Sequence, residues 1–548
     1  MRVMKKLLLI GTLLLPLFSR AQTVPEQVWV STDRNTYVAG DCIWVSAFCF
    51  DATASGRKLS AQSKVAYVEL LSSEGTAATM RLSLLGGRGG GVMAIPGNVP
   101  TGTYLLAAYT RCLGKGVDPL AGARRIRIFN TNATIRQKTV QIADHQPETE
   151  GERPLGRGVQ IALQRTAGQQ ESFPVTLQCA SDASVSVSVY KIDALEGTPS
   201  TGPVAPQPAT ACPAGTISTL EGEILTGHLE GRDAARTWDD PVCLPLISAP
   251  GNTADIYLGE KTTYGSYRFR TGNIFGRRDL VCEVLGLPET AECSLVIDDP
   301  FLHLSAESDE PLVLSEDLRA TLQARRKAMI HFRAQDIDTL VTPMPARTAL
   351  RLDEKMRIGY HLADYTKMTS VQEMIIEFIP ELRVRRDDGK HKQVQVRIDG
   401  GPQRPPLFAR GSMTLLDGVP MTYHENLLAF DPDLLSDILI YPHTYNVGTR
   451  TYDGVVNFIT AKGNISTALF PKQVRIFDFD GICPPVILPK GTPDCQTLYW
   501  HPLTELEAGK SHRIEVQTPA YKGRFRVVVE GLTQDGTPLY TEASFETL

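Results

Sequence analysis

Histidines and paired carboxylates are the side chains of this chain best suited to acid–base chemistry. His424 precedes Glu425, a pair that could act as a general base, but we expect His424, His443 and His501 to lie in exposed loops. The carboxylate pairs occupy turn positions, where Asp accepts backbone hydrogen bonds, so they do not indicate a glycosidase. These pairs are Asp239–Asp240, Asp298–Asp299, Asp387–Asp388 and Asp431/Asp433. No catalytic residue is predicted.

Motifs for cofactors, metals and nucleophiles are equally scarce. The sequence contains no His-Glu-x-x-His, no Gly-x-Ser-x-Gly and no phosphate-binding loop. The glycine run 86–91 lacks the following Lys-Ser/Thr, so we interpret it as a connection between strands. Asp431 and Asp433 supply too few oxygen ligands for calcium, and residues 338–340 (Asp-Thr-Leu) resemble a bacterial O-glycosylation site. We therefore expect no cofactor, no metal site and no enzymatic activity.

The cysteines could form disulfides or remain as buried thiols, and both alternatives stay open. No Cys-x-x-Cys is present, and the irregular spacing argues against zinc. Two pairs, Cys282/Cys293 and Cys483/Cys495, are close enough in sequence to close small loops. Cys42 and Cys49 are seven residues apart on one expected strand and would point to opposite faces. The ten cysteines are Cys42, Cys49, Cys112, Cys179, Cys212, Cys243, Cys282, Cys293, Cys483 and Cys495.

The first residues have the pattern of a secretory leader. Basic residues precede an apolar stretch from Leu7 to Phe18, and residues 19–21 (Ser-Arg-Ala) predict cleavage before Gln22. The stretch is too short to span about 30 Å of hydrocarbon, and no later stretch reaches 18 apolar residues. Removing 1–21 changes the formal net charge from −5 to −9, which disfavours nucleic-acid binding. We expect an exported protein in the periplasm or associated with the outer membrane.

The remaining chain is long enough for several domains, and its hydrophobic pattern is mainly that of strands. The predicted fold class is mainly β and multidomain, with tandem immunoglobulin-like or related β-sandwiches and one α+β domain. No helix is expected before residue 300. The predicted segments are a signal peptide at 1–21, β-sandwiches at 22–133 and 134–218 (the second with a long exposed loop), a β-domain at 219–300, a helical linker at 301–345, an α+β domain at 346–470 and a C-terminal β-segment at 471–548.

Two helices are expected in the second half of the chain. Ser315 can cap a helix that extends to Phe332, and the basic cluster 325–327 is interpreted as its solvated face. Ser370 and Glu373 form a capping-box pattern before a second helix, which Pro380 ends.

The N-terminal segment resembles the second macroglobulin-type domain of bacterial envelope proteins. The residues that carry this likeness, which covers about 22–130, are Thr32-Asp33-Arg34-x-x-Tyr37-x-Ala39-Gly40-Asp41-x-Ile43-Trp44, Tyr67-Val68-Glu69-Leu70 and Thr101-Gly102-Thr103-Tyr104. The thioester motif Cys-Gly-Glu-Gln of true macroglobulins is absent, so the resemblance implies no covalent protease trap. Glu221 to Gly227 is similar to the start of a carboxypeptidase-regulatory-type β-domain.

Residues 365–465 resemble the plug domain of TonB-dependent receptors. Five blocks agree in order: Ile379–Leu382, Val396–Gly400, Leu415–Pro420, Asp437–Ile440 and Tyr452–Thr460. Only 83 residues follow Ile465, whereas the 22-stranded barrel of a receptor needs well over ~200 residues. The resemblance therefore implies a plug-like domain without a transporter.

These features favour a non-enzymatic scaffold or interaction protein of the cell envelope. Its plug-like and sandwich domains would dock to an outer-membrane β-barrel or to another envelope protein, which is an inference by analogy of fold. An extracytoplasmic peptide- or glycan-binding protein is the alternative, and a cryptic hydrolase is a second one.

Overall fold

The computed structural model divides into two compact units and is mainly β, as the sequence predicts. Unit 1 comprises Met1–Leu220, Phe301–Thr342 and Cys483–Leu548, and unit 2 comprises Glu221–Pro300 and Pro343–Ile482. The leader 1–21 and residues 338–340 lie outside the described residues. The structure describes residues 23–53, 58–131, 158–196, 208–209, 211–213, 216–251, 253–263, 265–272, 274–306, 318–333, 350, 352–387, 391–398, 407–463, 469–484 and 495–548.

The first sandwich of unit 1 encloses the apolar faces of two antiparallel layers. Alternate residues of each strand point inward, so Ile43, Val68 and Leu106 are fully buried in one core. One layer has the order β1 (Glu26–Thr32), β3 (Cys42–Asp51), β6 (Arg88–Ala94), and the other β2 (Thr36–Val38), β8 (Arg124–Phe129), β7 (Gly102–Tyr109), β4 (Val65–Ser72), β5 (Gly75–Ser83). The short β28 (Ile482–Cys483) lies where the chain passes between the units.

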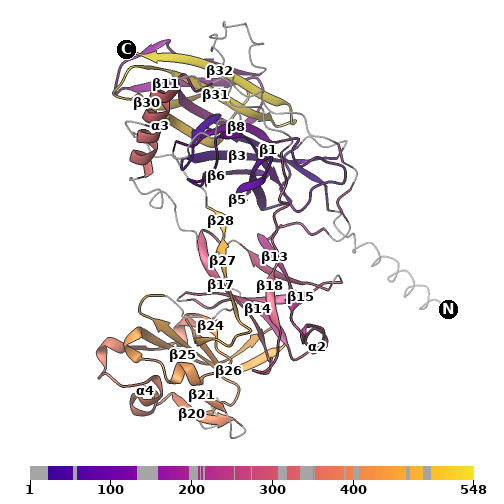
Figure 1. The fold of residues 1–548 in the computed structure, drawn as a ribbon, viewed down its shortest axis with the longest axis vertical. Coiled ribbons are helices and arrows are strands. Elements are labelled where there is room, and N and C mark those ends of the chain that lie inside the picture. Colours follow the sequence, from indigo (N-terminus) through magenta and orange to yellow (C-terminus); the bar gives the residue numbers. More distant parts are fainter. Residues whose placement is uncertain are drawn as a thin grey trace, which may run out of the picture. The chain divides into compact units, whose positions relative to one another are not determined.

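The second sandwich of unit 1 is built from two distant parts of the sequence (Figure 1). Its central strand β12 (Ala183–Ile192) pairs on one side with β31 (Gly523–Thr533) and on the other with β29 (Thr497–Leu506). The remaining strands are β10 (Thr166–Ala167) and β32 (Pro538–Thr547) in the same sheet, and β9 (Val159–Ala162), β11 (Ser172–Cys179) and β30 (Ser511–Gln517) in the facing one. The sequence prediction placed 134–218 and 471–548 in separate segments, whereas the strand pairing makes them one domain.

Unit 2 begins with a single curled sheet of seven strands. Its two outer strands, β18 and β27, contribute Leu295 and Phe479 to the same core, so the sheet curls until its ends meet there. The order is β18 (Ser294–Ile297), β13 (Glu223–Glu230), β16 (Tyr267–Gly272), β15 (Asp255–Lys261), β14 (Leu244–Ala249), β17 (Arg277–Leu285), β27 (Arg475–Asp480). Strand β27, predicted in the C-terminal segment, thus completes this sheet. Helix α2 (Ala234–Asp239) contradicts the expectation that no helix precedes residue 300.

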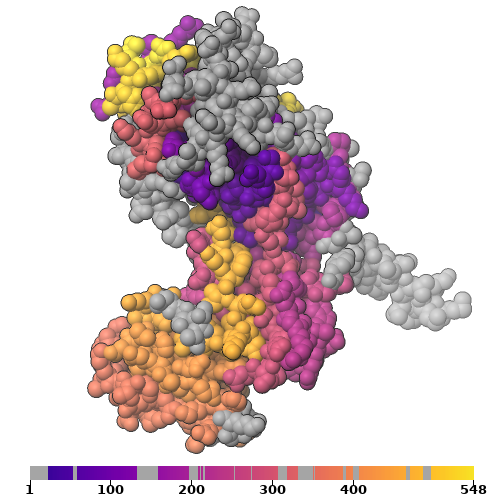
Figure 2. All heavy atoms as spheres, viewed as in Figure 1, coloured from indigo at the N-terminus to yellow at the C-terminus, as the bar shows by residue number. Residues whose placement is uncertain are grey.

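The α+β part of unit 2 packs against that sheet through a shared apolar cluster that includes Leu246, Leu415 and Val455, and the two form one continuous body (Figure 2). Its main sheet has the order β19 (Ile358–His361), β25 (Leu435–Val447), β26 (Arg450–Thr460), β23 (Met413–Leu416), β24 (Val419–Pro420). A second sheet consists of β20 (Leu382–Asp387), β21 (His391–Ile398) and β22 (Leu407–Phe408). The α-helices are α4 (Val371–Phe378) and α5 (Glu425–Leu428). Three short 3₁₀ helices complete this part: η2 (Glu354–Met356), η3 (Leu362–Asp364) and η4 (Pro432–Leu434).

Both predicted helices are present. Ser370 Oγ accepts a hydrogen bond from the N–H of Glu373 (3.2 Å), and the Glu373 carboxylate accepts one from the N–H of Thr369 (2.8 Å), so a capping box starts α4 as predicted. Helix α3 (Leu318–Arg333) belongs to unit 1, and Ser315 lies outside the described residues. Within the described part of the chain, no helix has the length and apolar character needed to cross a membrane.

Candidate functional site

The acidic and basic residues of the motif at 32–44 form a buried structural network. Asp33 Oδ1 accepts hydrogen bonds from Tyr37 Oη (2.7 Å) and from the N–H of Trp44 (3.1 Å). Arg34 forms an ion pair with Asp41 and also contacts Asp33 (3.2 Å). Burial raises the pKa of Asp33, although Arg34 opposes the shift. Because every charge here has a partner inside the fold, the motif fixes the turn from β2 to β3 and offers no vacant group for chemistry.

A second buried ion pair joins the two sandwiches of unit 1. Arg124 Nη1 contacts both carboxylate oxygens of Glu530, at 3.1 and 3.0 Å. Ser31 Oγ donates to the same carboxylate, and Arg124 Nε donates to Asn35 Oδ1 at 3.1 Å. An intact buried ion pair contributes little net free energy to folding, but removing one partner is strongly destabilising because it leaves an unpaired buried charge. It therefore holds the two sandwiches in one arrangement.

The glycine run at 86–91 contributes to this same packing: Gly86 and Gly87 connect two strands, as predicted, whereas residues 88–91 lie within β6 itself. Gly90 lies on β6, where a Cβ atom would come within 2.4 Å of Pro502 Cγ on β29. On the adjacent surface, Trp44 and Trp500 have ring centroids 5.2 Å apart, and Ser46 Oγ is 3.0 Å from Ser186 Oγ. The absence of a side chain at Gly90 therefore lets the two sheets approach closely.

The basic cluster of α3 is only partly solvated, which corrects the sequence-based interpretation. Arg326 and Lys327 are exposed, whereas the Arg325 side chain is 2 % exposed. The Arg325 guanidinium contacts Asp193 (2.6 Å) and Glu196 (2.8 Å) and donates to the carbonyl of Thr36 (2.6 Å). Arg325 thus anchors α3 to the rest of unit 1. Helical periodicity does not distinguish Arg325 from its neighbours, so the sequence carried no signal for this role.

His424 is buried, and its prediction as an exposed loop residue was wrong. Its Nδ1 accepts a hydrogen bond from the N–H of Val394 (2.8 Å), and Nε2 lies 3.0 Å from the carbonyl of Met421, to which it can only donate. Burial lowers the pKa of His424 to about 4, so the ring is neutral at pH 7. Both nitrogens are occupied by the backbone, which excludes a general-base role. His443 is half-buried, and His501 Nδ1 is 3.0 Å from Thr504 Oγ1.

Two of the four carboxylate pairs stabilise turns, as expected, whereas Asp387 ends strand β20 and Asp388 lies outside the described residues. Asp240 accepts from the N–H of Val242 (2.9 Å), and Asp431 accepts from the N–H of Asp433 (2.9 Å) at the start of η4. The Asp433 carboxylate pairs with Lys367 at 2.5 Å. Across the residues that the structure describes, no group of three His, Cys, Asp or Glu side chains is arranged to hold a metal ion.

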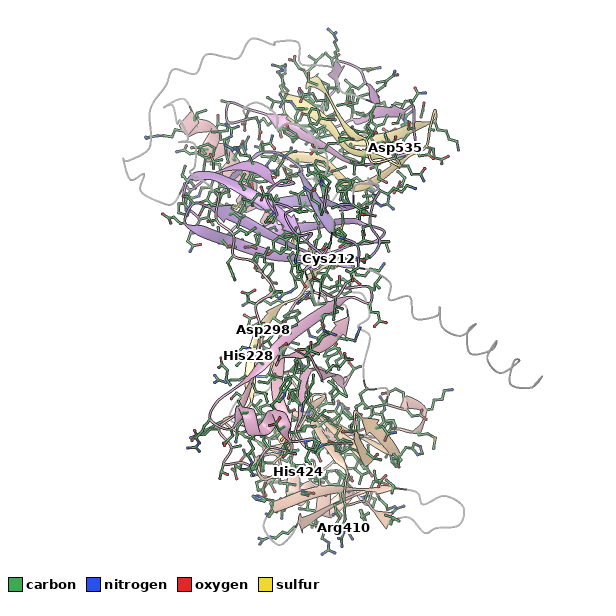
Figure 3. The ribbon with its side chains drawn as sticks, turned by 90° about the vertical axis from the view of Figure 1, so that its right-hand side faces the viewer. Cys212, His228, Asp298, Arg410, His424 and Asp535 are labelled. Atoms are coloured by element: carbon green, nitrogen blue, oxygen red, sulfur yellow. The ribbon has the colours of Figure 1, made fainter. Side chains whose placement is uncertain are left out.

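Asp298 differs from the other pairs because it contacts a histidine on the neighbouring strand (Figure 3). His228 Nδ1 lies 2.7 Å from Asp298 Oδ1, and Nε2 lies 3.4 Å from Glu230. These hydrogen bonds, chiefly that to Asp298, raise the pKa of His228. The pair resembles the base and orienting acid of a hydrolase, but the second ring nitrogen faces a carboxylate instead of a hydroxyl or thiol. The geometry fits an exposed cross-strand ion pair.

The sheet β20–β21–β22 presents a basic face that the sequence reasoning did not single out. Leu382 and Val384 point into the core, so Arg383 and Arg385 point to the opposite face. Arg397 lies on that face of β21, and Arg410 follows β22 (Figure 3). The signal that could have found this face is strand alternation in the segment Leu-Arg-Val-Arg.

The charges on this face differ in how they are compensated. Arg383 donates to Gln395 (2.9 Å) and stacks over Phe408, with 4.3 Å from Cζ to the ring centroid. The exposed guanidinium groups of Arg385, Arg397 and Arg410 contact no carboxylate among the described residues. Each of these three exposed guanidinium groups can bind an anionic group, because Arg binds carboxylate and phosphate in a bidentate manner.

Comparisons with known proteins provide only distant similarity. No family model matches the chain, and no curated protein matches it. Among solved structures, Escherichia coli alpha-2-macroglobulin activated by porcine elastase has 8 % identity and a TM-score of 0.24, with 95 % of this chain and 43 % of that chain covered. Salmonella alpha-2-macroglobulin reacted with methylamine has 9 % identity and a TM-score of 0.23, covering 96 % and 40 %. The chain thus spans less than half the length of these macroglobulins.

Proposed function

We propose that this protein is a non-enzymatic scaffold or interaction protein of the bacterial cell envelope, and that it docks to an outer-membrane β-barrel through unit 2. The observation that carries the proposal is the basic face of β20–β21–β22, whose exposed guanidinium groups have no described carboxylate partner. The formal net charge of the chain is −5, so this face departs in sign from the molecule as a whole. A partner that presents carboxylates at the rim of its barrel would complement it.

Two sequence features support the location and the choice of partner. The leader-like segment 1–21 supports export, and the likeness of residues 365–465 to a receptor plug supports a barrel as the partner. The buried networks of unit 1 support a structural role for that unit, because their charged groups contact one another inside the fold.

The test compares charge-reversal variants of the full chain in co-purification from solubilised envelopes. We expect the wild type to retain an outer-membrane β-barrel protein, identified by mass spectrometry, at about 0.05 M salt and to release it at about 0.5 M salt. The double variant Arg385→Glu/Arg397→Glu should lose that protein. The variant Arg326→Glu/Lys327→Glu is the matched control, because it makes the same change in charge at exposed positions of α3.

The outcomes separate docking from its alternatives. Equal recovery of the barrel with both double variants would show that the basic face is not the docking surface. Failure of the wild type to retain a barrel, together with binding to an immobilised glycan that the Arg385→Glu/Arg397→Glu variant loses, would overturn the proposal in favour of a glycan-binding protein.

A further inference from the structure

We propose that Cys112 and Cys212 are a redox pair whose disulfide fastens the chain segment around residue 212 to the first sandwich. This goes beyond the docking function and does not depend on it. The Cys212 thiol donates to the carbonyl of Cys112 at 3.5 Å and to that of Thr23 at 3.6 Å. No disulfide joins any of the ten cysteines in the structure.

The backbone just before Cys212 is already held in place. Ala209 donates its N–H to the carbonyl of Ala52 (2.6 Å), and the N–H of Lys115 donates to the carbonyl of Ala211 (2.9 Å). Ala209 is 5 % exposed and packs in a small apolar cluster with Ala52 and Val117. A disulfide forms without backbone movement only where the fold has already brought the two cysteines together. These contacts keep Cys212 next to Cys112, whose carbonyl oxygen lies 3.5 Å from the Cys212 sulfur, and Figure 3 labels Cys212 beside the strands of the first sandwich.

The two thiols differ in access, which sets the order of the chemistry. Cys112 is fully buried, whereas Cys212 is partly exposed. An oxidant that carries its own disulfide, such as a thiol–disulfide oxidoreductase, can therefore reach only Cys212. The Cys212 thiolate attacks one sulfur of that disulfide, forms a mixed disulfide and displaces the other sulfur as a thiolate. The Cys112 thiolate then attacks the Cys212 sulfur and displaces the second oxidant sulfur.

The atoms and electrons of this exchange balance. Cys112 and Cys212 lose two protons and two electrons, and the oxidant disulfide takes up both to become a dithiol. The buried carboxylate of Glu26 opposes the deprotonation of both thiols. Burial, followed by the charge of Glu26, raises the pKa of Cys112 to about 12, and the same two causes raise the pKa of Cys212. The reaction should therefore be slow with a small-molecule disulfide at pH 7 and faster at higher pH.

The pairing differs from the small loops that the sequence suggested. Neither of those pairs, Cys282/Cys293 and Cys483/Cys495, forms a disulfide in the structure. The Cys112–Cys212 bond would instead close a loop of 100 residues, which contains β8 and the first four strands of the second sandwich. Closing a long loop restricts the unfolded chain more than closing a short one. Unit 1 should therefore melt at a higher temperature when the pair is oxidised.

The experiment uses the reduced, purified full chain incubated with oxidised glutathione at about pH 8, near the ordinary thiol pKa. The protein is then alkylated under denaturing conditions, digested and analysed by mass spectrometry. We expect a linked peptide pair that contains Cys112 and Cys212. The Cys282→Ser control should retain this link, and Cys212→Ser should abolish it.

A melting curve supplies a second readout. Oxidation should raise the melting temperature of unit 1 by roughly 10 °C. The melting of this unit is monitored by the fluorescence of Trp29, Trp44 and Trp500. The Cys212→Ser variant should show no such redox dependence. Full alkylation of both cysteines after oxidation, or a link from Cys112 to Cys49, which also lies beside Glu26, would overturn the proposal.

Discussion

The strongest quantitative prediction concerns Glu283, a carboxyl buried where the curled sheet of unit 2 packs on its α+β part. Glu283 is 3 % exposed, and its Oε1 atom has no hydrogen-bond partner among the described residues. It pairs across the sheet with Leu246, a member of the apolar cluster at that contact. Burial raises the pKa of Glu283 to about 8. The folded protein therefore holds this side chain protonated at pH 7.

The sign of the effect follows from proton binding. Between the unfolded pKa of 4.5 and the folded pKa of about 8, the folded state binds a proton that the unfolded state does not. Stability therefore falls as the pH rises through this window, by about 1.4 kcal/mol per pH unit, and the loss reaches about 3 kcal/mol at pH 7. Replacing Glu283 by Gln keeps the shape and removes the titration. We expect Glu283→Gln to stabilise unit 2 by about 3 kcal/mol at pH 7.

Unfolding of the full chain in guanidinium, monitored by the fluorescence of Trp238, measures this difference in stability between the variant and the wild type. Trp238 is the single tryptophan within the sequence of unit 2, so subtracting the signal of a Trp238→Phe variant isolates that unit. The advantage of Glu283→Gln over the wild type should be largest at pH 8 and should vanish near pH 4. The control Glu289→Gln changes an exposed carboxylate and should have the same stability as the wild type. If Glu283→Gln has the same free energy of unfolding as the wild type at pH 7 and the same pH profile, then Glu283 is not held protonated and the reasoning is wrong.

Three further predictions test the buried contacts. As the pH falls from 6.5 to about 4, the unfolded state binds a proton at His424 that the folded state does not, so unit 2 should lose stability. His424→Gln should remove this acid sensitivity, measured by guanidinium unfolding monitored at Trp238. Arg325→Met should destabilise unit 1 by about 3–5 kcal/mol in thermal unfolding, because it leaves two buried carboxylates unpaired, whereas the exposed Arg326→Met should not. Gly90→Ala should lower the stability of unit 1 by about 1–3 kcal/mol, because its Cβ would clash with Pro502, and unchanged denaturant midpoints would contradict that packing.

Local patterns in the sequence predicted local structure well. Valines at 185, 187 and 189 alternate with serines, which predicts a strand, and the strand is present as β12. Ser370 and Glu373 are three residues apart, which predicted the start of α4. Each of these signals depends only on neighbouring residues, so the sequence displays it directly. Helix α2 was missed because its six residues are too few to show a helical period.

Tertiary contacts were not predictable in the same way. The serine face of β12 is buried because the first sandwich covers it, as the Ser46–Ser186 contact shows. His424 and Arg325 have ordinary surface patterns in the sequence, and only the elements packed over them make them buried. The candidate docking face was missed for a related reason. Its arginines come from separate strands, and only strand pairing, which places Arg397 opposite Glu381, puts them on one face.

The pairing of β12 with strands from the end of the sequence also dictates the order in which the protein can fold. Val159 and Thr541, which share a hydrogen bond, are 382 residues apart. A growing chain therefore completes all of unit 2 before the second sandwich has its last strands, and contacts over such a distance form slowly. Until then the apolar strand β12 has two open edges, which are a template for aggregation. During synthesis this strand needs protection from other chains, by a chaperone or by delayed folding.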